Sequence, residues 1–500
     1  METGTIIALI IYFLLMLAIG IYAYRQSSSN LSEYMLGGRK LGPAITALSA
    51  GASDMSGWLL MGLPGALYLS GISQIWIAIG LVLGAWANYL FLAPRFRIYT
   101  EIAKDSITLP DYFEHRFGDT TRSLRLISAL VIVVFFTLYT ASGVVAGGKL
   151  FETVFQLDYF YGLALTVSVV IVYTLLGGFL AVSMTDFVQG IIMFLALVIV
   201  PVVTIDVVGG ITPMLNVVQA LNPSHLDLFT GTSVLGIISL LAWGLGYFGQ
   251  PHIIVRFMAI RSVKDFPVAR RIGMSWMIVS LLGAIATGFV GIAYVQQTST
   301  TLADPETIFI LLSQVLFHPF VTGFLLAALL AAVMSTISSQ LLVTSSALTQ
   351  DFYKTFFNKT ASDSHLVMMG RLSVLLVAIV AVVIALDRSS SILSLVSNAW
   401  AGFGAAFGPV VLFSLYWPRM TRQGALAGMV VGAATVLFWI YSPISVNGTP
   451  LNDLLYAMVP GVAMSAIAIV IGSMLSAKPA EELLAQFAQM QRELESSRNT

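Results

Sequence analysis

Long apolar stretches constrain the fold of this chain more than any other feature. A helix needs about 20 predominantly apolar residues to cross a bilayer. Of the 500 residues, 58% are hydrophobic and 10% are charged, whereas about 25% of the residues of an ordinary soluble domain are charged. The pattern predicts an all-α integral membrane protein with about 13 transmembrane helices, at residues 4–24, 41–66, 72–94, 124–147, 160–180, 184–206, 233–255, 272–296, 317–347, 368–387, 391–417, 424–442 and 452–476.

The distribution of basic residues predicts the orientation of these segments. Loops on the cytoplasmic side of a membrane carry an excess of Lys and Arg. With the N-terminus outside, the inner loops and the residues that border them hold every Lys and Arg except Lys149 and Arg388. We therefore expect a multi-pass membrane protein with its N-terminus outside and its C-terminus in the cytoplasm. The first segment lacks a basic leader and an evident cleavage site, so we expect a retained helix rather than a signal peptide.

The chain is expected to form one transmembrane domain, residues 1–476, and a polar cytoplasmic tail, residues 477–500. Apolar residues recur at helical spacing in the tail, which predicts a short amphipathic helix: Leu483, Phe487, Met490 and Leu494. The formal net charge is zero and the chain has no cysteine. These features argue against nucleic acid as a partner and exclude disulfides and thiolate metal sites.

Two predicted segments are interrupted. The helix of the second segment is expected to break around Gly51–Gly57, where small residues predominate. The seventh segment holds three glycines and Pro251 within eight residues. The two are five segments apart, so each could open one five-helix unit, segments 2–6 and 7–11. Such paired breaks are typical of inverted-repeat secondary transporters. The alternative is that Gly and Pro are simply frequent in membrane helices.

Asp54 lies halfway along a stretch, Leu41–Leu69, that contains no other Asp, Glu, Lys, Arg or His. A charged residue at the centre of a membrane helix costs roughly 2.5–3.5 kcal/mol on insertion scales, and such residues usually face an ion or substrate path. A hydroxyl cluster in segment 9 offers further oxygen ligands for a hard cation: Ser335, Thr336, Ser338 and Ser339. The alternative for each hydroxyl is a bond to the preceding helical turn. Asp54 could ligate the cation or set the local field.

Aromatic residues next to both breaks indicate a pocket for an organic solute. Trp58 lies in segment 2, and Trp243 and Tyr247 lie in segment 7. Ligand pockets are mostly apolar and aromatic with a few placed polar groups. The alternative is that these rings belong to interfacial belts. A small zwitterion or neutral solute fits this setting better than a multivalent anion.

Six motifs of the chain resemble the sodium/solute symporter family, in the form typical of its proline-transporting members. The resemblance runs from about residue 5 to residue 476 and is carried by Ala47–Gly65, Leu109–Phe113, Gly177–Ala181, Gly244–His252, Ala331–Thr336 and Trp400–Pro409. It implies a LeuT-type inverted repeat of five plus five helices with broken helices 2 and 7. It also implies sodium-coupled import of L-proline by alternating access, with sodium as the coupling ion and no enzymatic activity.

The resemblance also implies roles for individual residues. Sodium would be bound by the carbonyls of Ala52, Met55 and Ala332 and the hydroxyls of Ser335 and Thr336, with Asp54 needed for sodium affinity. Ser56 and Gly57 match positions tied to ligand affinity. Proline would be bounded by Trp58, Tyr139, Trp243, Tyr247 and Pro251. Arg39 and Asp186 match inner-gate residues, unless they are plain charges at helix boundaries.

Three other functions are alternatives to sodium-coupled import of proline. A sodium symporter for another small amino or carboxylic acid is the main alternative. An intramembrane aspartyl protease would need a second carboxylate at similar depth, and Asp186 and Asp206 lie at segment ends. A sensor built on a transporter core would carry a soluble signalling domain, and only about 24 residues follow the last segment.

Overall fold

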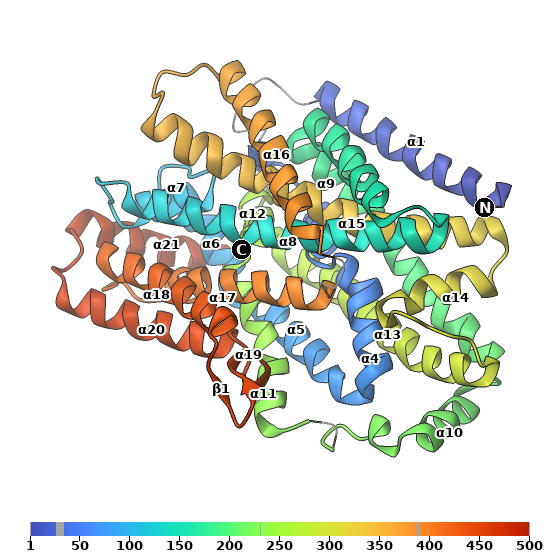
Figure 1. Ribbon diagram of the computed structural model, residues 1–500. Coiled ribbons are helices and arrows are strands. Elements are labelled where there is room, and N and C mark those ends of the chain that lie inside the picture. The colour runs from blue at the N-terminus through green and yellow to red at the C-terminus, as the bar shows by residue number, and fades with distance from the viewer. Residues whose placement is uncertain (1, 27–34, 231, 388–390, 500) are drawn as a thin grey trace.

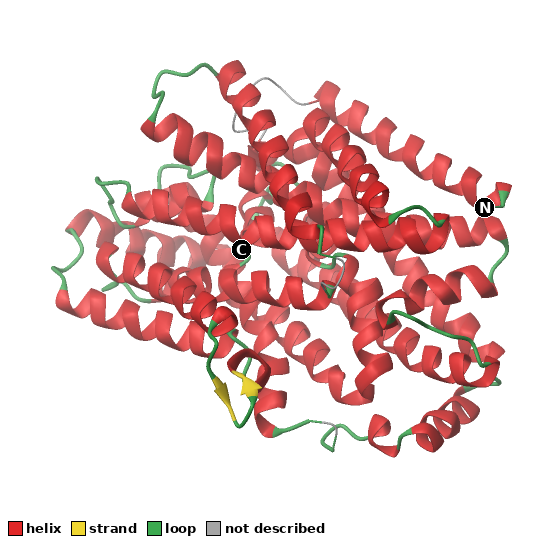
Figure 2. Ribbon diagram, in the orientation of Figure 1, coloured by secondary structure: helices red, strands yellow, loops and turns green. Residues whose placement is uncertain are grey.

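A computed structural model describes residues 2–26, 35–230, 232–387 and 391–499. The described chain is almost entirely helical (Figure 2), and its strands β1 (Ser445–Val446) and β2 (Thr449–Pro450) form one short antiparallel hairpin. The apolar helices are α1 (Thr3–Gln26), α3 (Pro43–Asp54), α4 (Leu63–Ser70), α5 (Ile75–Ala87), α6 (Ala93–Ile102), α8 (Ser123–Phe155), α9 (Tyr159–Val207), α11 (Val234–Leu241), α12 (Pro251–Ala259), α13 (Phe266–Thr298), α15 (Pro319–Ser346), α16 (Asp363–Ala385), α17 (Ile392–Tyr416), α18 (Arg422–Tyr441) and α20 (Met458–Leu475).

Shorter elements connect these helices or cover their ends. The peripheral helices are α7 (Leu109–Arg116), α10 (Ile211–Leu221), α14 (Ile308–Leu316), α19 (Leu451–Leu454) and α21 (Glu481–Asn499). The 3-10 and π-helical turns are η1 (Gly37–Arg39), η2 (Trp58–Gly62), η3 (Gly71–Gln74), η4 (Asn88–Leu92), η5 (Pro223–Leu226), η6 (Ala242–Gly249), η7 (Val263–Asp265), η8 (Pro305–Thr307) and η9 (Ala347–Lys354).

In the described part of the chain, ten helices are long and apolar enough to cross a membrane, or eleven if the pair on either side of Gln250 is one span. The predicted count of 13 stays a prediction. The numbers differ because predicted segments merge into longer helical runs: Trp58–Ile102 is one run of 45 residues. Within α9, Gly178 adopts φ 58° and ψ −171°, which kinks the helix between the predicted fifth and sixth segments.

Both predicted breaks are present. The second segment becomes α3, a non-helical stretch at residues 55–56, and then η2 and α4. The seventh becomes α11, the 3-10 turn η6 and, after Gln250, α12, with a 44° bend. The first break packs among α9, α12, α13 and α15, and η6 packs between α5 and α17. The two interrupted helices therefore lie at the centre of the helix bundle.

The ends of the chain pack against this core at different places. Helix α1 lies along α9 and α15 on one side of the molecule, and α17, α18 and α20 form a layer on the other (Figure 1). Helix α21 packs on α6 through its buried residues Phe487, Met490 and Leu494. The amphipathic helix predicted for the tail is therefore present, and the division of the chain at residue 476 stays a prediction.

Candidate functional site

The break in α3 leaves a backbone carbonyl without its helical partner. In a continuous helix the N–H of Ser56 would donate to the carbonyl of Ala52. Met55 instead adopts ψ 72°, and the Ser56 N–H donates to the carbonyl of Asp54 at 2.9 Å. The sequence favours this departure because Ser and Gly surround it, and these residues form local bonds or lose most on being fixed in a helix. The Ala52 oxygen is therefore free to face a neighbouring helix.

Two hydroxyls of α15 converge on that carbonyl oxygen. The Ser335 hydroxyl donates to it at 2.8 Å and the Thr336 hydroxyl at 3.5 Å. Ser335 also lies 3.3 Å from the carbonyl oxygen of Ala332. All four residues are buried, so four hard oxygens from α3 and α15 lie close together in an apolar interior. This donor set is the kind that binds a hard cation.

Met55 and Asp54 differ in how they relate to this oxygen cluster. Met55 is fully buried beside the break, but no hydrogen bond joins its carbonyl to α15. The Asp54 carboxylate leaves the cluster altogether. Its Oδ2 accepts a 2.5 Å hydrogen bond from the Tyr247 hydroxyl, and it lines a cavity beside α13. In this conformation the carboxylate is therefore bonded to η6, whereas the hydroxyls of Ser335 and Thr336 bond to the Ala52 carbonyl.

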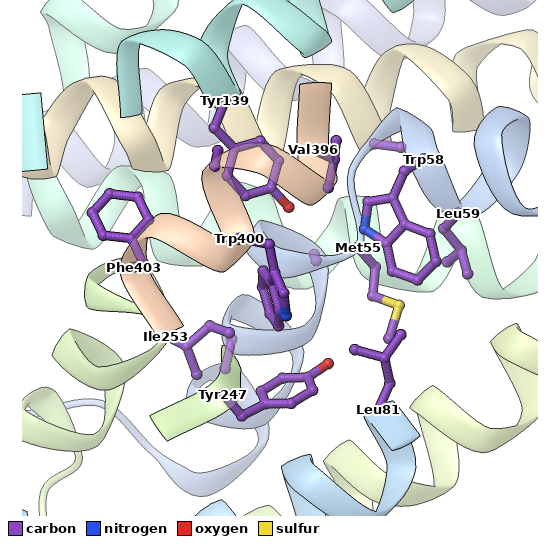
Figure 3. Packing of buried hydrophobic residues seen from close by; sticks show 14 of the residues in the cluster. Met55, Trp58, Leu59, Leu81, Tyr139, Tyr247, Ile253, Val396, Trp400 and Phe403 are labelled. Atoms are coloured by element: carbon purple, nitrogen blue, oxygen red, sulfur yellow. The ribbon is translucent and has the colours of Figure 1, made fainter. Parts of the chain in front are cut away.

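Both tyrosines of the expected pocket point at the break. The Tyr139 hydroxyl, from α8, donates to the Asp54 carbonyl at 3.1 Å, and Tyr247, from η6, holds the Asp54 carboxylate. Figure 3 shows the two hydroxyls directed toward the stretch that carries Met55 and Trp58. The Trp58 indole N–H also donates to the Asp54 carbonyl, at 3.3 Å. Helix α3, η6 and α8 are thus joined at one residue.

The tryptophans of the two broken helices lie beside each other. The rings of Trp58 and Trp243 are 6.2 Å apart, and Trp243 stacks on Tyr456 at 5.5 Å. Trp400, from α17, donates its indole N–H to the Trp243 carbonyl at 2.7 Å and meets the Tyr247 ring edge-on at 5.2 Å. The result is a buried aromatic cluster that spans both breaks.

Three further expected residues have different surroundings. Gly57 is needed for close packing, because a β-carbon there would lie 2.8 Å from the Ala146 side chain of α8. Ser56 is buried, and its hydroxyl oxygen accepts a hydrogen bond from the backbone N–H of Trp58 at 3.4 Å. Pro251 begins α12 and lines a different cavity, one that lies beside Phe179 and Asp351. The structure does not bring Pro251 into the aromatic cluster.

The two expected gate residues both join separate elements. Arg39 in η1 donates to the Asp105 carboxylate at 2.9 Å and to the carbonyl oxygens of Met258 and Ser106, each at 2.8 Å. Burial, followed by repulsion from Arg97, lowers the pKa of Arg39 from its usual range. An arginine stays charged in proteins, so these contacts link η1, α12 and the loop after α6 with a permanent cation.

Asp186 is fully buried in the second half of α9 and is not a charge at a helix boundary. Its Oδ2 accepts from Ser49 at 2.8 Å, from Arg256 at 3.1 Å and from Ser339 at 3.4 Å. These partners come from α3, α12 and α15. A buried ion pair is costly to break, by about 3–5 kcal/mol, when one partner is removed. Asp186 therefore holds α9 to three core helices.

Sequence reasoning missed Trp400, Tyr456 and Arg256. Trp400 lies in a motif whose glycines suggested only helix packing, and its mid-segment position was the available signal. Tyr456 lies near the start of a predicted segment, where an interfacial position is the ordinary interpretation. Arg256 lies at the end of one, yet it is buried against Asp186. The partners that explain each residue are distant in the sequence.

Comparison with known proteins identifies the family. The profile of the sodium:solute symporter family matches residues 34–432. The chain belongs to the sodium:solute symporter family. It is similar to the high-affinity proline transporter PutP of Bacillus subtilis, with 60% identity over 94% of this chain and 98% of that protein. It is also similar to the osmoregulated proline transporter OpuE of Bacillus subtilis, with 56% identity over 98% of this chain and 99% of that protein.

A third relative is the sodium/proline symporter of Staphylococcus aureus, 58% identical over 95% of this chain and 93% of that protein. Among solved structures, the fold is similar to a substrate-bound, outward-open Na⁺-coupled sialic acid symporter. The TM-score is 0.82, with 21% identity over 96% of this chain and 99% of that one. At that identity the likeness shows the fold alone. The predicted family and the predicted LeuT-type transporter fold are confirmed.

Proposed function

We propose that this protein is a sodium-coupled secondary active symporter that imports L-proline by alternating access. The observation that supports it most is the convergence of the α15 hydroxyls on the freed Ala52 carbonyl of α3. Relatives of 56–60% identity named as proline transporters and sodium/proline symporters support the substrate and the coupling ion. The chain is a transporter and not an enzyme, as its family indicates.

Sodium in this proposal bridges α3 and α15. Its ligands would be the carbonyls of Ala52, Met55 and Ala332 and the hydroxyls of Ser335 and Thr336. Asp54 supplies the nearby negative charge, two residues from Ala52 on the same helix. The bound cation replaces the hydrogen bonds by which the hydroxyls now hold α3, and so stabilises one arrangement of the two helices. A ligand shifts a conformational equilibrium only by such a difference in affinity between states.

Proline in this proposal binds between the two broken helices, bounded by the rings of Trp58, Tyr139, Trp243 and Tyr247. The four aromatic rings supply apolar area, and the freed backbone groups of the breaks supply hydrogen bonds for a carboxylate and an amine. Ser56 and Gly57 act indirectly: Gly57 permits the close approach of α8, which carries Tyr139. Pro251 acts by ending the bend and beginning α12.

We place the N-terminus outside a bacterial inner membrane and the C-terminus in the cytoplasm, with residues 1–476 as the transport domain and 477–500 as its tail. The excess of Lys and Arg on one side supports this orientation. Arg39 and Asp186 then lie in the inner half, where they hold the cytoplasmic path closed. An inward membrane potential adds roughly 2.3 kcal/mol per charge for each 100 mV, which suits concentrative uptake.

Uptake of labelled proline into proteoliposomes tests the function. With the purified protein, an inward sodium gradient should drive saturable uptake that unlabelled proline abolishes and other amino acids leave largely intact. Dissipating the gradient with a sodium ionophore should remove accumulation. Sodium-driven flux without preference for proline would favour a symporter for another small amino or carboxylic acid. Flux that is independent of sodium would contradict the cation site.

Replacing Ser335 by Ala tests the sodium ligands. A hydrogen bond to a charged group is worth about 1.5–3 kcal/mol, so loss of one ligand should raise the sodium concentration for half-maximal uptake by roughly tenfold or more. Ser338→Ala is the matched control, because the Ser338 hydroxyl bonds back to the Ser335 carbonyl of its own helix at 3.1 Å. Equal effects of the two substitutions would count against the assigned site.

Labelling of an introduced cysteine tests the inner gate and the orientation together. The protein has no native cysteine, and Ser346 lines the cavity between α12 and η9. A membrane-impermeant maleimide should label Ser346→Cys in inside-out vesicles only. Arg39→Ala or Asp186→Asn should raise the labelling rate several-fold, while replacement of the exposed Lys264 by Ala should not. Faster labelling in right-side-out vesicles would reverse the proposed orientation.

A further inference from the structure

Asp54 lines a small cavity. The cavity has a volume of about 30 Å³ and lies between α3, η4, η6 and α13. Its lining includes Asp54, Asn88, Tyr89, Tyr247 and Met277, and is otherwise mostly apolar. One water molecule needs about 10–15 Å³ of such volume and two to four polar partners. The space therefore suits one or two small polar molecules.

Two residues that line this cavity carry buried polar atoms without partners. Asp54 is 2% exposed and Asn88 is 1% exposed. Oδ1 of Asp54 and both polar atoms of Asn88 have no hydrogen-bond partner among the described residues. Buried amides and carboxylates are almost always hydrogen-bonded, so each exception requires an explanation. Here both residues line the same cavity, which indicates a common ligand.

The backbone at Asn88 is also unusual. Asn88 begins the π-helical turn η4, which runs to Leu92 and interrupts the helix made of α5 and α6. Pro94 follows and lacks the N–H that a regular helix would use. Single π turns inside α-helices are frequent at functional sites. This second observation is independent of the missing partners, and it concerns the same residue.

Asp54 has no cationic side chain to balance it in this cavity. The lining residues include no Lys, Arg or His. Tyr247 donates to one oxygen of the Asp54 carboxylate. The other oxygen needs a second hydrogen-bond donor, which would also fix the orientation of the carboxylate. Asn88 carries such a donor, and a water molecule between the two side chains would donate to Asp54 and accept from the Asn88 amide.

We propose that Asn88 is a positioning residue for sodium binding, which acts on Asp54 through one water molecule held in this cavity. Together with Tyr247, it fixes the orientation of the Asp54 carboxylate two residues from Ala52, and in this proposal the field of that carboxylate attracts the cation. The proposal rests on the proposed sodium-coupled function and assigns part of its sodium affinity to α5 and η4. The residue does not touch the cation or the transported solute.

Sodium titrations of uptake test this role. Asn88→Leu, which removes the amide at similar volume, should raise the sodium concentration for half-maximal uptake about five- to tenfold. The apparent proline affinity at saturating sodium should change less than twofold. Met277→Leu is the matched control, because Met277 lines the same cavity without a hydrogen-bonding group comparable to the amide. If the leucine variant is unstable in a thermal melt, Asn88→Ala takes its place.

A double substitution separates positioning from a general packing effect. In an Asp54→Asn background, Asn88→Leu should cause no further loss of sodium affinity, since residues that act as a unit are not additive. Additive losses, a wild-type titration for Asn88→Leu, or an equal effect of Met277→Leu would overturn the proposal. Uptake by the wild-type protein that needs no sodium would instead overturn the proposed function, so the two failures are distinguishable.

Discussion

The hydrogen bond between the Ser335 hydroxyl and the Ala52 carbonyl is the contact on which this account depends. It exists because the backbone leaves the helix at Met55 and withdraws the Ser56 N–H from Ala52. An unpaired carbonyl in an apolar interior costs several kcal/mol, so another helix must satisfy it. Helix α15 does so with hydroxyls, and the same oxygens form a suitable cation site. The hydroxyls that satisfy the unpaired carbonyl of the break are therefore the same hydroxyls that form the proposed cation site.

Each of the two buried carboxylates near this contact accepts hydrogen bonds from another element at one of its oxygens. Asp54 is held by Tyr247, and Asp186 is held by Ser49, Ser339 and Arg256. Both carboxylates connect α3 to helices that are distant in the sequence. Movement of α3 relative to α15 would therefore change the environment of the Ala52 oxygen and of both carboxylates together. This coupling gives alternating access a physical basis in the described contacts.

Features formed by contiguous residues were predictable from the sequence, whereas contacts between helices that are distant in the chain were not. The break at Gly51–Gly57 and the hydroxyls of segment 9 follow from residue types that are contiguous in the chain. The family and the transporter fold were predicted and confirmed, whereas the count of 13 segments and the assigned site residues stay predictions. Arg256, Trp400 and Asn88 went unnoticed because their roles depend on partners from other helices.

A high-resolution structure determined in sodium, with a matched structure in potassium, tests whether sodium binds between α3 and α15. We predict a sodium-dependent density peak between the carbonyls of Ala52, Met55 and Ala332 and the hydroxyls of Ser335 and Thr336, with the Asp54 carboxylate outside its coordination shell. A sodium-dependent peak bound directly by Asp54, with the oxygens of α15 unchanged, would contradict the account. So would two structures without any difference at the break.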